Sequence, residues 1–227
     1  MKLSIIIPVF NEAKTITKIL KKVLELDLEG WQKEIIIIND SSTDQTKKVI
    51  NRFTKKGVKV VSHQQNLGKG AAIRTGLAKA TGDFVIIQDA DLEYNPNDIR
   101  SLLVTAENNP GFVIYGSRFR GRHEDTVFGH KAGNALLTLL TNLLYGSSLS
   151  DMETCYKLIP VTHLHRLKLE SNRFNFEPEV TAKLLRLGIG ILEVPINYKK
   201  RGYSEGKKIK WHDGVSAALT LLKYRWL

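Results

Sequence analysis

The sequence has a single cysteine, Cys155, so no intramolecular disulfide can form and nothing points to an oxidising compartment. It also has no apolar run near the length of about 18 residues that a transmembrane helix requires. The apolar run at residues 4–8 is typical of a strand and is too short for a secretory signal. These absences favour a cytoplasmic protein, and they leave contact with a membrane surface open.

Acidic residues are outnumbered. The 23 Asp and Glu stand against 34 Lys and Arg, which gives a net charge of +11. This excess favours anionic partners, namely nucleotides, lipid phosphates, membrane surfaces or nucleic acids, without choosing among them. The length of 227 residues and the hydrophobic share of 42% fit one soluble α/β domain covering residues 1–227.

Short apolar runs alternate with amphipathic stretches in the first half of the chain. Four consecutive isoleucines at residues 35–38 are typical of a strand that is covered on both faces. The alternation predicts an α/β fold with a doubly wound, mainly parallel sheet and helices on both faces. Strands are expected at residues 3–8, 34–39, 58–62 and 83–88, and helices at residues 14–26, 44–53 and 70–80.

The second half is less regular. Strands are expected at residues 112–115, 155–159 and 189–195, and helices at residues 99–107, 132–145 and 179–187. A basic loop at residues 199–210 precedes a last amphipathic helix. The six leucines within residues 132–145 favour a buried core helix, and the alternative is a helix that partly enters a membrane interface. The apolar residues near the C-terminus, among them Leu219 and Trp226, pose the same choice.

Two aspartates, Asp89 and Asp91, directly follow an apolar run at residues 84–87. The carboxyl edge of a parallel sheet is where α/β folds bind ligands. Two carboxylates one residue apart at that edge would share Mg²⁺ or Mn²⁺, which also takes phosphate oxygens, and Glu93 would add a third carboxylate. Taken alone, the triplet is more typical of a loop rich in turn-forming aspartates than of a metal site.

Polar residues also follow the first two strands, at residues 8–12 and 39–44. Asp40 stands at a strand tip and is a candidate for hydrogen bonding to a nucleobase or ribose, whereas Asp44 suits a helix N-cap. At residues 66–72, glycines precede a helix. They would let the backbone approach an anion or would simply form a tight turn.

These four segments occur in the order and approximate spacing found in family 2 glycosyltransferases of the GT-A fold, and the chain resembles that family. Within it, the chain is most similar to dolichol-phosphate and polyprenyl-phosphate mannosyltransferase-like enzymes. The resemblance implies a nucleotide-sugar-binding half at residues 1–116 and an acceptor-binding half at residues 117–227. The resemblance to these enzymes also rests on residues 88–94, 115–119, 151–157, 173–179 and 193–196.

The resemblance also implies roles for individual residues. Phe10 stands where many members carry Tyr, and Ser41 replaces a commoner Gly. Asp91 would be catalytic, and the metal would be held by Asp89, Asp91 and Glu93, although the Glu93 position is Gln in some relatives. The nucleotide would contact Pro8, Phe10, Glu12, Asp40 and Asp89, and Arg201 and Lys208 would close over its phosphates; Arg118 and Lys131 would face the acceptor phosphate.

By resemblance, the expected reaction is inverting and metal-dependent, and it moves mannose from GDP-mannose to a dolichyl or undecaprenyl phosphate at the inner face of the membrane. A phosphate acceptor is already anionic and needs cations. A hydroxyl acceptor needs a general base, for which Asp151 is the candidate. The alternative is a UDP-sugar enzyme with a hydroxyl acceptor in cell-wall or polysaccharide synthesis. A nucleic-acid partner is not expected, because no recognition motif accompanies the charge.

Overall fold

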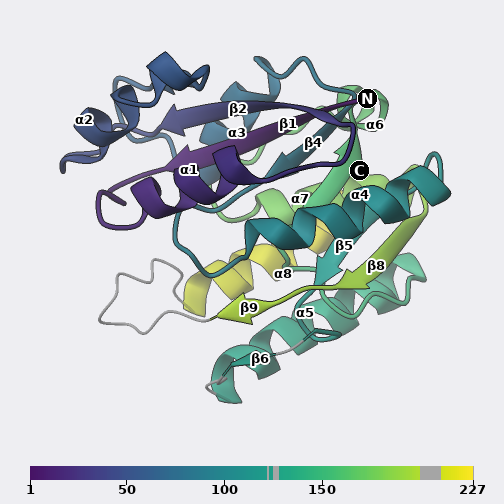
Figure 1. Cartoon of the computed structure of the whole chain (residues 1–227). Coiled ribbons are helices and arrows are strands. Elements are labelled where there is room, and N and C mark those ends of the chain that lie inside the picture. The colour runs from purple at the N-terminus through teal and green to yellow at the C-terminus, as the bar shows by residue number, and fades with distance from the viewer. Residues whose placement is uncertain (122, 125–127, 200–210, 227) are drawn as a thin grey trace.

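The fold is built on a mainly parallel sheet (Figure 1). The computed structural model describes residues 1–121, 123–124, 128–199 and 211–226. The seven strands lie in the order β3-β2-β1-β4-β7-β5-β8, and β6 pairs with β9 in a second, two-stranded sheet. The strands are β1 (Lys2–Val9), β2 (Gln32–Asn39), β3 (Lys59–Ser62), β4 (Phe84–Ile87), β5 (Val113–Ser117), β6 (His123–Glu124), β7 (Lys157–Pro160), β8 (Ile191–Pro195) and β9 (Tyr198–Lys199).

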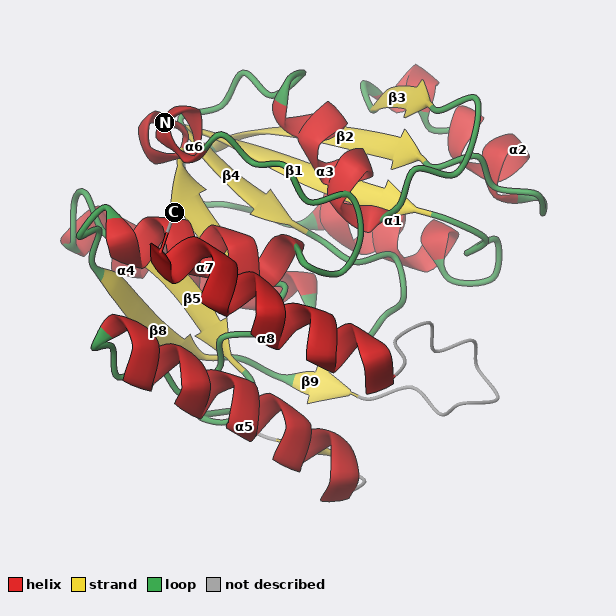
Figure 2. Cartoon of the chain, turned by 180° about the vertical axis from the view of Figure 1, so that it is seen from behind, coloured by secondary structure: helices red, strands yellow, loops and turns green. Residues whose placement is uncertain are grey.

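Helices cover both faces of the main sheet, as the sequence predicts. Helices α1 and α4 lie in front of the sheet in Figure 1, and α3, α5, α7 and α8 lie in front of it in the reverse view of Figure 2. Within the described chain, no helix combines the length and apolarity needed to cross a membrane. The helices are α1 (Ile16–Glu25), α2 (Thr46–Asn51), α3 (Lys69–Leu77), α4 (Ile99–Asn108), α5 (Phe128–Tyr145), α6 (Val161–Leu167), α7 (Phe176–Arg186) and α8 (Trp211–Trp226).

The central strands are buried on both faces. In β1 and β2, Ile5 pairs with Ile35 and Ile7 with Ile37, and all four side chains lie in the core. Removing this apolar surface from water is the main force that holds the sheet between its helices. The run of isoleucines is not interrupted by polar residues because helices cover both faces of these strands.

One strand departs from the parallel arrangement. Strand β7 runs antiparallel between β4 and β5, and it begins at Lys157, two residues later than the sequence predicts. The sequence also gives no warning of α6, which follows β7 directly at Val161. Because β7 is antiparallel, its amino end lies at the edge where β1, β2 and β4 have their carboxyl ends. Residues 151–156 are thereby brought to the same edge as Asp91.

Candidate active site

Strained turns follow three neighbouring strands at this edge. Asn11, Ser41 and Leu92 have φ angles of 53°, 59° and 68°, and they lie in the loops that follow β1, β2 and β4. Non-glycine residues rarely adopt this left-handed conformation, and such strain gathers at functional sites. The angle at Ser41 also explains why glycine suits this position in the family that the chain resembles.

The loops after β1 and β2 are joined by hydrogen bonds. The side chain of Asn11 accepts from the backbone N–H of Thr43 at 2.8 Å, and the backbone N–H of Glu12 donates to Thr46 Oγ1 at 2.9 Å. The predicted nucleotide residues Pro8 and Phe10 are half-buried here, whereas Glu12 is buried. Their contact with a nucleotide stays a prediction.

Asp40 is buried and holds the loop in front of α3. Its carboxylate accepts from the backbone N–H groups of Leu67 at 2.9 Å and Gly68 at 2.8 Å. It also lies 2.7 Å from Nδ1 of His63. Sequence reasoning assigns Asp40 to the base or ribose, and that contact stays a prediction. In this structure the Asp40 carboxylate fixes the position of the loop at residues 67–68, which borders the site.

Gly68→Ala should lower the free energy of unfolding by about 2–4 kcal/mol. Gly68 has a φ of 99°, and an added Cβ would lie 2.4 Å from the carbonyl oxygen of Asn172. Gly57→Ala is the matched control, because Gly57 has a φ of 79° and open space around its Cβ position. Urea unfolding of both variants separates the cost of a positive φ angle from the cost of the contact with Asn172. Equal losses of stability in the two variants would show that the contact with Asn172 adds nothing.

Lys69, at the first position of α3, bridges two carboxylates. Its Nζ lies 3.0 Å from Asp89 Oδ1 and 3.0 Å from Glu177 Oε1. Burial by itself lowers the pKa of Lys69, but the attraction of Asp89 and Glu177 outweighs it and raises the pKa of Lys69 well above its ordinary value. The Lys69 ammonium therefore offsets part of the negative charge of Asp89 and Glu177.

Asp91 occupies the turn after β4, where the backbone N–H of Glu93 donates to its Oδ1 at 3.1 Å. Glu93 is engaged on its other side, since its carboxylate accepts from the hydroxyl of Tyr198 in β9 at 2.8 Å. Within the described part of the chain, no three acidic, histidine or cysteine side chains converge on one point. The expected set of Asp89, Asp91 and Glu93 is thus not a closed cage. Its oxygen donors suit a hard cation that takes further ligands from a diphosphate and water.

Arg118 and Asp151 are paired with each other. The Arg118 guanidinium donates to both Asp151 oxygens, at 2.8 and 2.7 Å, and the Arg118 backbone N–H donates to Oδ2 at 2.8 Å. Asp151 is 0% exposed, and its own backbone N–H donates to Glu193. The residue predicted to face the acceptor phosphate and the residue predicted as base are therefore two halves of one buried ion pair.

A further acidic group lies behind this pair. Within the described residues, Oε1 of Glu153 is buried without a hydrogen-bond partner. Burial, reinforced by the carboxylate of Glu177, raises the pKa of Glu153 to about 7. Burial lowers the pKa of the neighbouring Lys157 to about 8. Glu153 therefore changes charge near neutral pH, which gives the site a titrating carboxyl that sequence reasoning does not assign.

Glu153→Gln should raise the free energy of unfolding by about 1–3 kcal/mol at about pH 7 and have little effect at about pH 5. The folded chain holds the Glu153 proton more tightly than the unfolded chain, whose pKa is near 4.5, so wild-type stability falls as pH rises from 4.5 to about 7. Urea unfolding across this range measures the effect. Glu193→Gln should instead lose stability, because Glu193 accepts from Ser150 and Asp151. A pH-independent gain in Glu153→Gln would contradict the assignment.

Three predicted cations cannot be placed. Arg201 and Lys208 lie outside the described residues. Lys131 belongs to α5, and its side chain is likewise outside the described part of the structure. Their predicted contacts with phosphates stay predictions.

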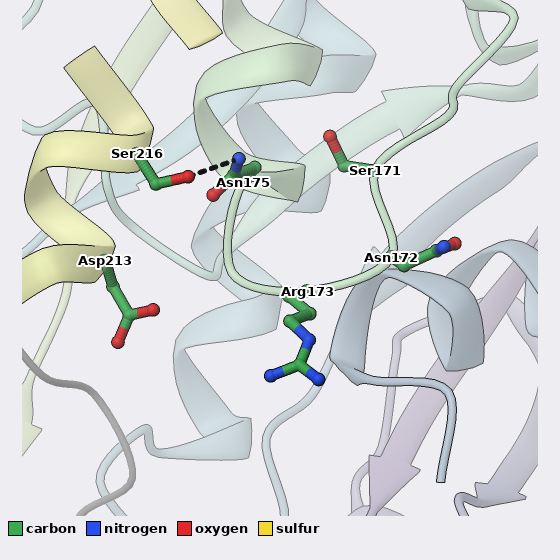
Figure 3. A pocket seen from close by; sticks show the side chains of 6 residues that line it. All are labelled: Ser171, Asn172, Arg173, Asn175, Asp213 and Ser216. Carbon is green, nitrogen blue, oxygen red and sulfur yellow. Dashed lines mark hydrogen bonds between the residues drawn. The ribbon is translucent and has the colours of Figure 1, made fainter. Parts of the chain in front are cut away.

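A polar hollow of about 260 Å³ lies where the loop before α7 meets the first turns of α8 (Figure 3). Within it, Asn175 donates to the hydroxyl of Ser216 at 2.8 Å. The same loop packs over Gly68 and Gly70, so the hollow adjoins the start of α3 and Lys69. The lining residues are Ser171, Asn172, Arg173, Asn175, Asp213 and Ser216.

Sequence reasoning misses the residues that act through distant partners. Lys69 and Glu177 stand inside segments that carry the family resemblance, yet their pairing across 108 positions leaves no pattern in the sequence. His63 and Tyr198 are missed for the same reason. For Lys69, its place between two glycines at a helix start is the only local signal.

The mainly parallel sheet with helices on both faces is the fold of GT-A glycosyltransferases. Glucosyl-3-phosphoglycerate synthase from Mycobacterium tuberculosis, solved with UDP, superimposes with a TM-score of 0.72 over 100% of this chain and 80% of its own, at 22% identity. The same enzyme solved with Mn²⁺, UDP and glucosyl-3-phosphoglycerate gives a TM-score of 0.71. At this identity the likeness establishes the fold.

The chain belongs to glycosyl transferase family 2, whose model matches residues 4–167. It is 26% identical to dolichyl-phosphate beta-glucosyltransferase ALG5A of Trichomonas vaginalis, over 97% of this chain and 72% of the relative. It is 28% identical to undecaprenyl-phosphate 4-deoxy-4-formamido-L-arabinose transferase of Edwardsiella ictaluri, over 90% of this chain and 62% of the relative. The chain thus spans about two thirds of the length of these relatives.

Proposed function

We propose that this glycosyltransferase moves a sugar from a nucleotide diphosphate donor to a polyprenyl phosphate. The observation that carries the proposal is the Arg118–Asp151 ion pair, which buries the expected general base and occupies both of its oxygens. An acceptor that already bears an anionic oxygen needs no base. Two relatives named for dolichyl-phosphate and undecaprenyl-phosphate reactions support the same acceptor.

The turn after β4 suits the leaving group. Asp91, with Asp89 beside it, would hold Mg²⁺ or Mn²⁺, which neutralises the departing diphosphate. The Lys69 ammonium, fixed between Asp89 and Glu177, keeps these carboxylates in place and limits their mutual repulsion. The acceptor oxygen would attack the anomeric carbon from the face opposite the diphosphate, so the configuration of the sugar would invert.

GDP-mannose is the first donor to test, and UDP-glucose is the second. The assay measures transfer from a panel of GDP- and UDP-sugars to a polyprenyl phosphate, with Mg²⁺, with Mn²⁺ and with a chelator. The expected results are transfer from one donor, loss of transfer with the chelator and a product with inverted configuration. Absence of transfer from every donor in the presence of metal and lipid phosphate would overturn the proposal.

One observation favours a second function, transfer from a UDP-sugar to a hydroxyl acceptor. A carboxyl group with a pKa of about 7, such as that of Glu153, suits a general base at neutral pH. If that function held, Glu153→Gln would lower transfer strongly and the wild-type rate would rise with pH through about 7. If the acceptor is a phosphate, Glu153→Gln leaves transfer within a few-fold of wild type.

The proposed acceptor places the enzyme at a membrane. We propose a peripheral location at the cytoplasmic face, where a nucleotide sugar and a lipid phosphate meet. The net charge of +11 supports this location, because the headgroups at that surface are anionic. Fractionation of cells that express the chain tests it: recovery with membranes, and release by salt or mild alkali, is the expected result.

A further inference from the structure

Helix α5 exposes three of its six leucines and buries two of its threonines. Leu136, Leu139 and Leu143 are exposed, Leu143 at 75%, whereas Thr138 and Thr141 are buried. Both threonine hydroxyls make hydrogen bonds inside the protein, and residues 132–150 contain no charged side chain. A helix on a water-facing surface has the opposite pattern, so the outer face of α5 is suited to an apolar environment.

A second apolar stripe lies on α8, which packs against α5. Leu221 and Tyr224 of α8 face a cluster that includes leucines of α5. Because α5 and α8 lie side by side on the same side of the sheet (Figure 2), their outer surfaces both point away from the core. The exposed side chains on α8 recur at helical spacing at Val215, Leu219, Leu222 and Trp226, the last 79% exposed. Together with Leu136, Leu139 and Leu143 they form the α5–α8 apolar face.

Cations border this face. The guanidinium of Arg225 lies 5.2 Å from the Trp226 ring centroid. The charges of Arg186 and Arg225 both act on the hydroxyl of Tyr145 at the end of α5. Lys223 is also exposed on α8, and its Nζ lies 3.4 Å from Oε2 of the exposed Glu170. An apolar face with a basic border complements anionic headgroups over acyl chains, whereas a second copy of a chain with net charge +11 would bring like charges together.

We propose that the α5–α8 apolar face docks onto the surface of an anionic lipid bilayer. The leucines and Trp226 would enter the boundary between headgroups and acyl chains, and Lys223, Arg186 and Arg225 would contact the headgroups. This docking goes beyond the proposed reaction, because it needs neither a sugar donor nor a polyprenyl phosphate.

Vesicle flotation with the full chain tests the docking. The vesicles are phosphatidylcholine alone or with about 30% phosphatidylglycerol, and they contain no polyprenyl phosphate. Wild type should float with the mixed vesicles, bind pure phosphatidylcholine more weakly and release partly at high salt. Leu139→Gln/Leu143→Gln should bind the mixed vesicles at least about tenfold more weakly. Val104→Gln is the matched control, since Val104 is an apolar residue 52% exposed on α4 across the sheet, and it should bind like wild type.

Three outcomes would overturn the docking. They are failure of wild type to float, wild-type binding by Leu139→Gln/Leu143→Gln, and an equal loss in Val104→Gln. Sedimentation in solution adds a fourth. If wild type is a dimer and the double variant is a monomer that still binds vesicles, the face is buried between two copies. Because the vesicles lack acceptor, failure of the transfer reaction leaves this result unaffected, and failure of docking leaves the transfer reaction untouched.

Discussion

Asp91→Asn is expected to lower sugar transfer by at least about 10²–10³-fold while leaving the fold unchanged. The substitution removes the negative charge of Asp91 but keeps an oxygen that can accept the backbone N–H of Glu93, which lies 3.1 Å from Oδ1 in the wild type. The turn after β4 is therefore preserved, and the loss of sugar transfer measures how much the negative charge of Asp91 contributes. Initial rates at several metal concentrations measure the effect.

The chain offers a matched control for this variant. Asp27 accepts the backbone N–H of Glu29 at 3.1 Å, the same local hydrogen bond, but in the connection that leads into β2, away from the site edge. Asp27→Asn should leave transfer unchanged. Near-wild-type transfer by Asp91→Asn, or an equal loss in Asp27→Asn, would remove Asp91 from the diphosphate and metal site.

Arg118→Ala should destabilise the protein by about 3–5 kcal/mol, because it leaves the Asp151 carboxylate buried without its cation. Asp151 is 0% exposed, so water cannot replace the lost partner at low cost. Urea unfolding measures the loss, with unchanged far-ultraviolet circular dichroism of the folded state as the check on structure.

The double variant separates the ion pair from any role in substrate binding. Arg118→Ala/Asp151→Asn should recover much of the lost stability, since no unpaired charge remains. If Arg118 also faces the acceptor phosphate, this stable double variant will still need more acceptor than wild type, at an unchanged donor requirement. Equal destabilisation of the double and single variants would show that the pair is not the source of the loss.

The parallel sheet could be predicted because its signal is local. The isoleucine run at residues 35–38 and the stripe Ile16, Ile19, Leu20 and Val23 carry their periodicity within one element, and both are buried where expected. The positions of Asp40 and Asp91 at the carboxyl edge followed from strand direction alone. The antiparallel β7 could not be predicted, because short strands carry no mark of their direction.

The chemistry of the site was harder to predict, because it depends on pairs that are distant in sequence. The sequence suggests separate roles for Arg118 and Asp151, whereas the structure joins them in one ion pair. Periodicity also misleads at α5, where the leucine content favours a core helix, yet half of the leucines face outward. A leucine-rich helix with polar residues on one face has the same sequence pattern whichever face is buried.

The most direct test of the phosphate acceptor compares two acceptors that differ only in the head group, a polyprenyl phosphate and the polyprenol of the same length, with the same nucleotide sugar and metal. Sugar should be transferred to the phosphate alone, and hydrolysis of the product should release free sugar and the lipid phosphate. Transfer to the polyprenol, or to another hydroxyl acceptor in preference to the phosphate, would contradict the phosphate acceptor.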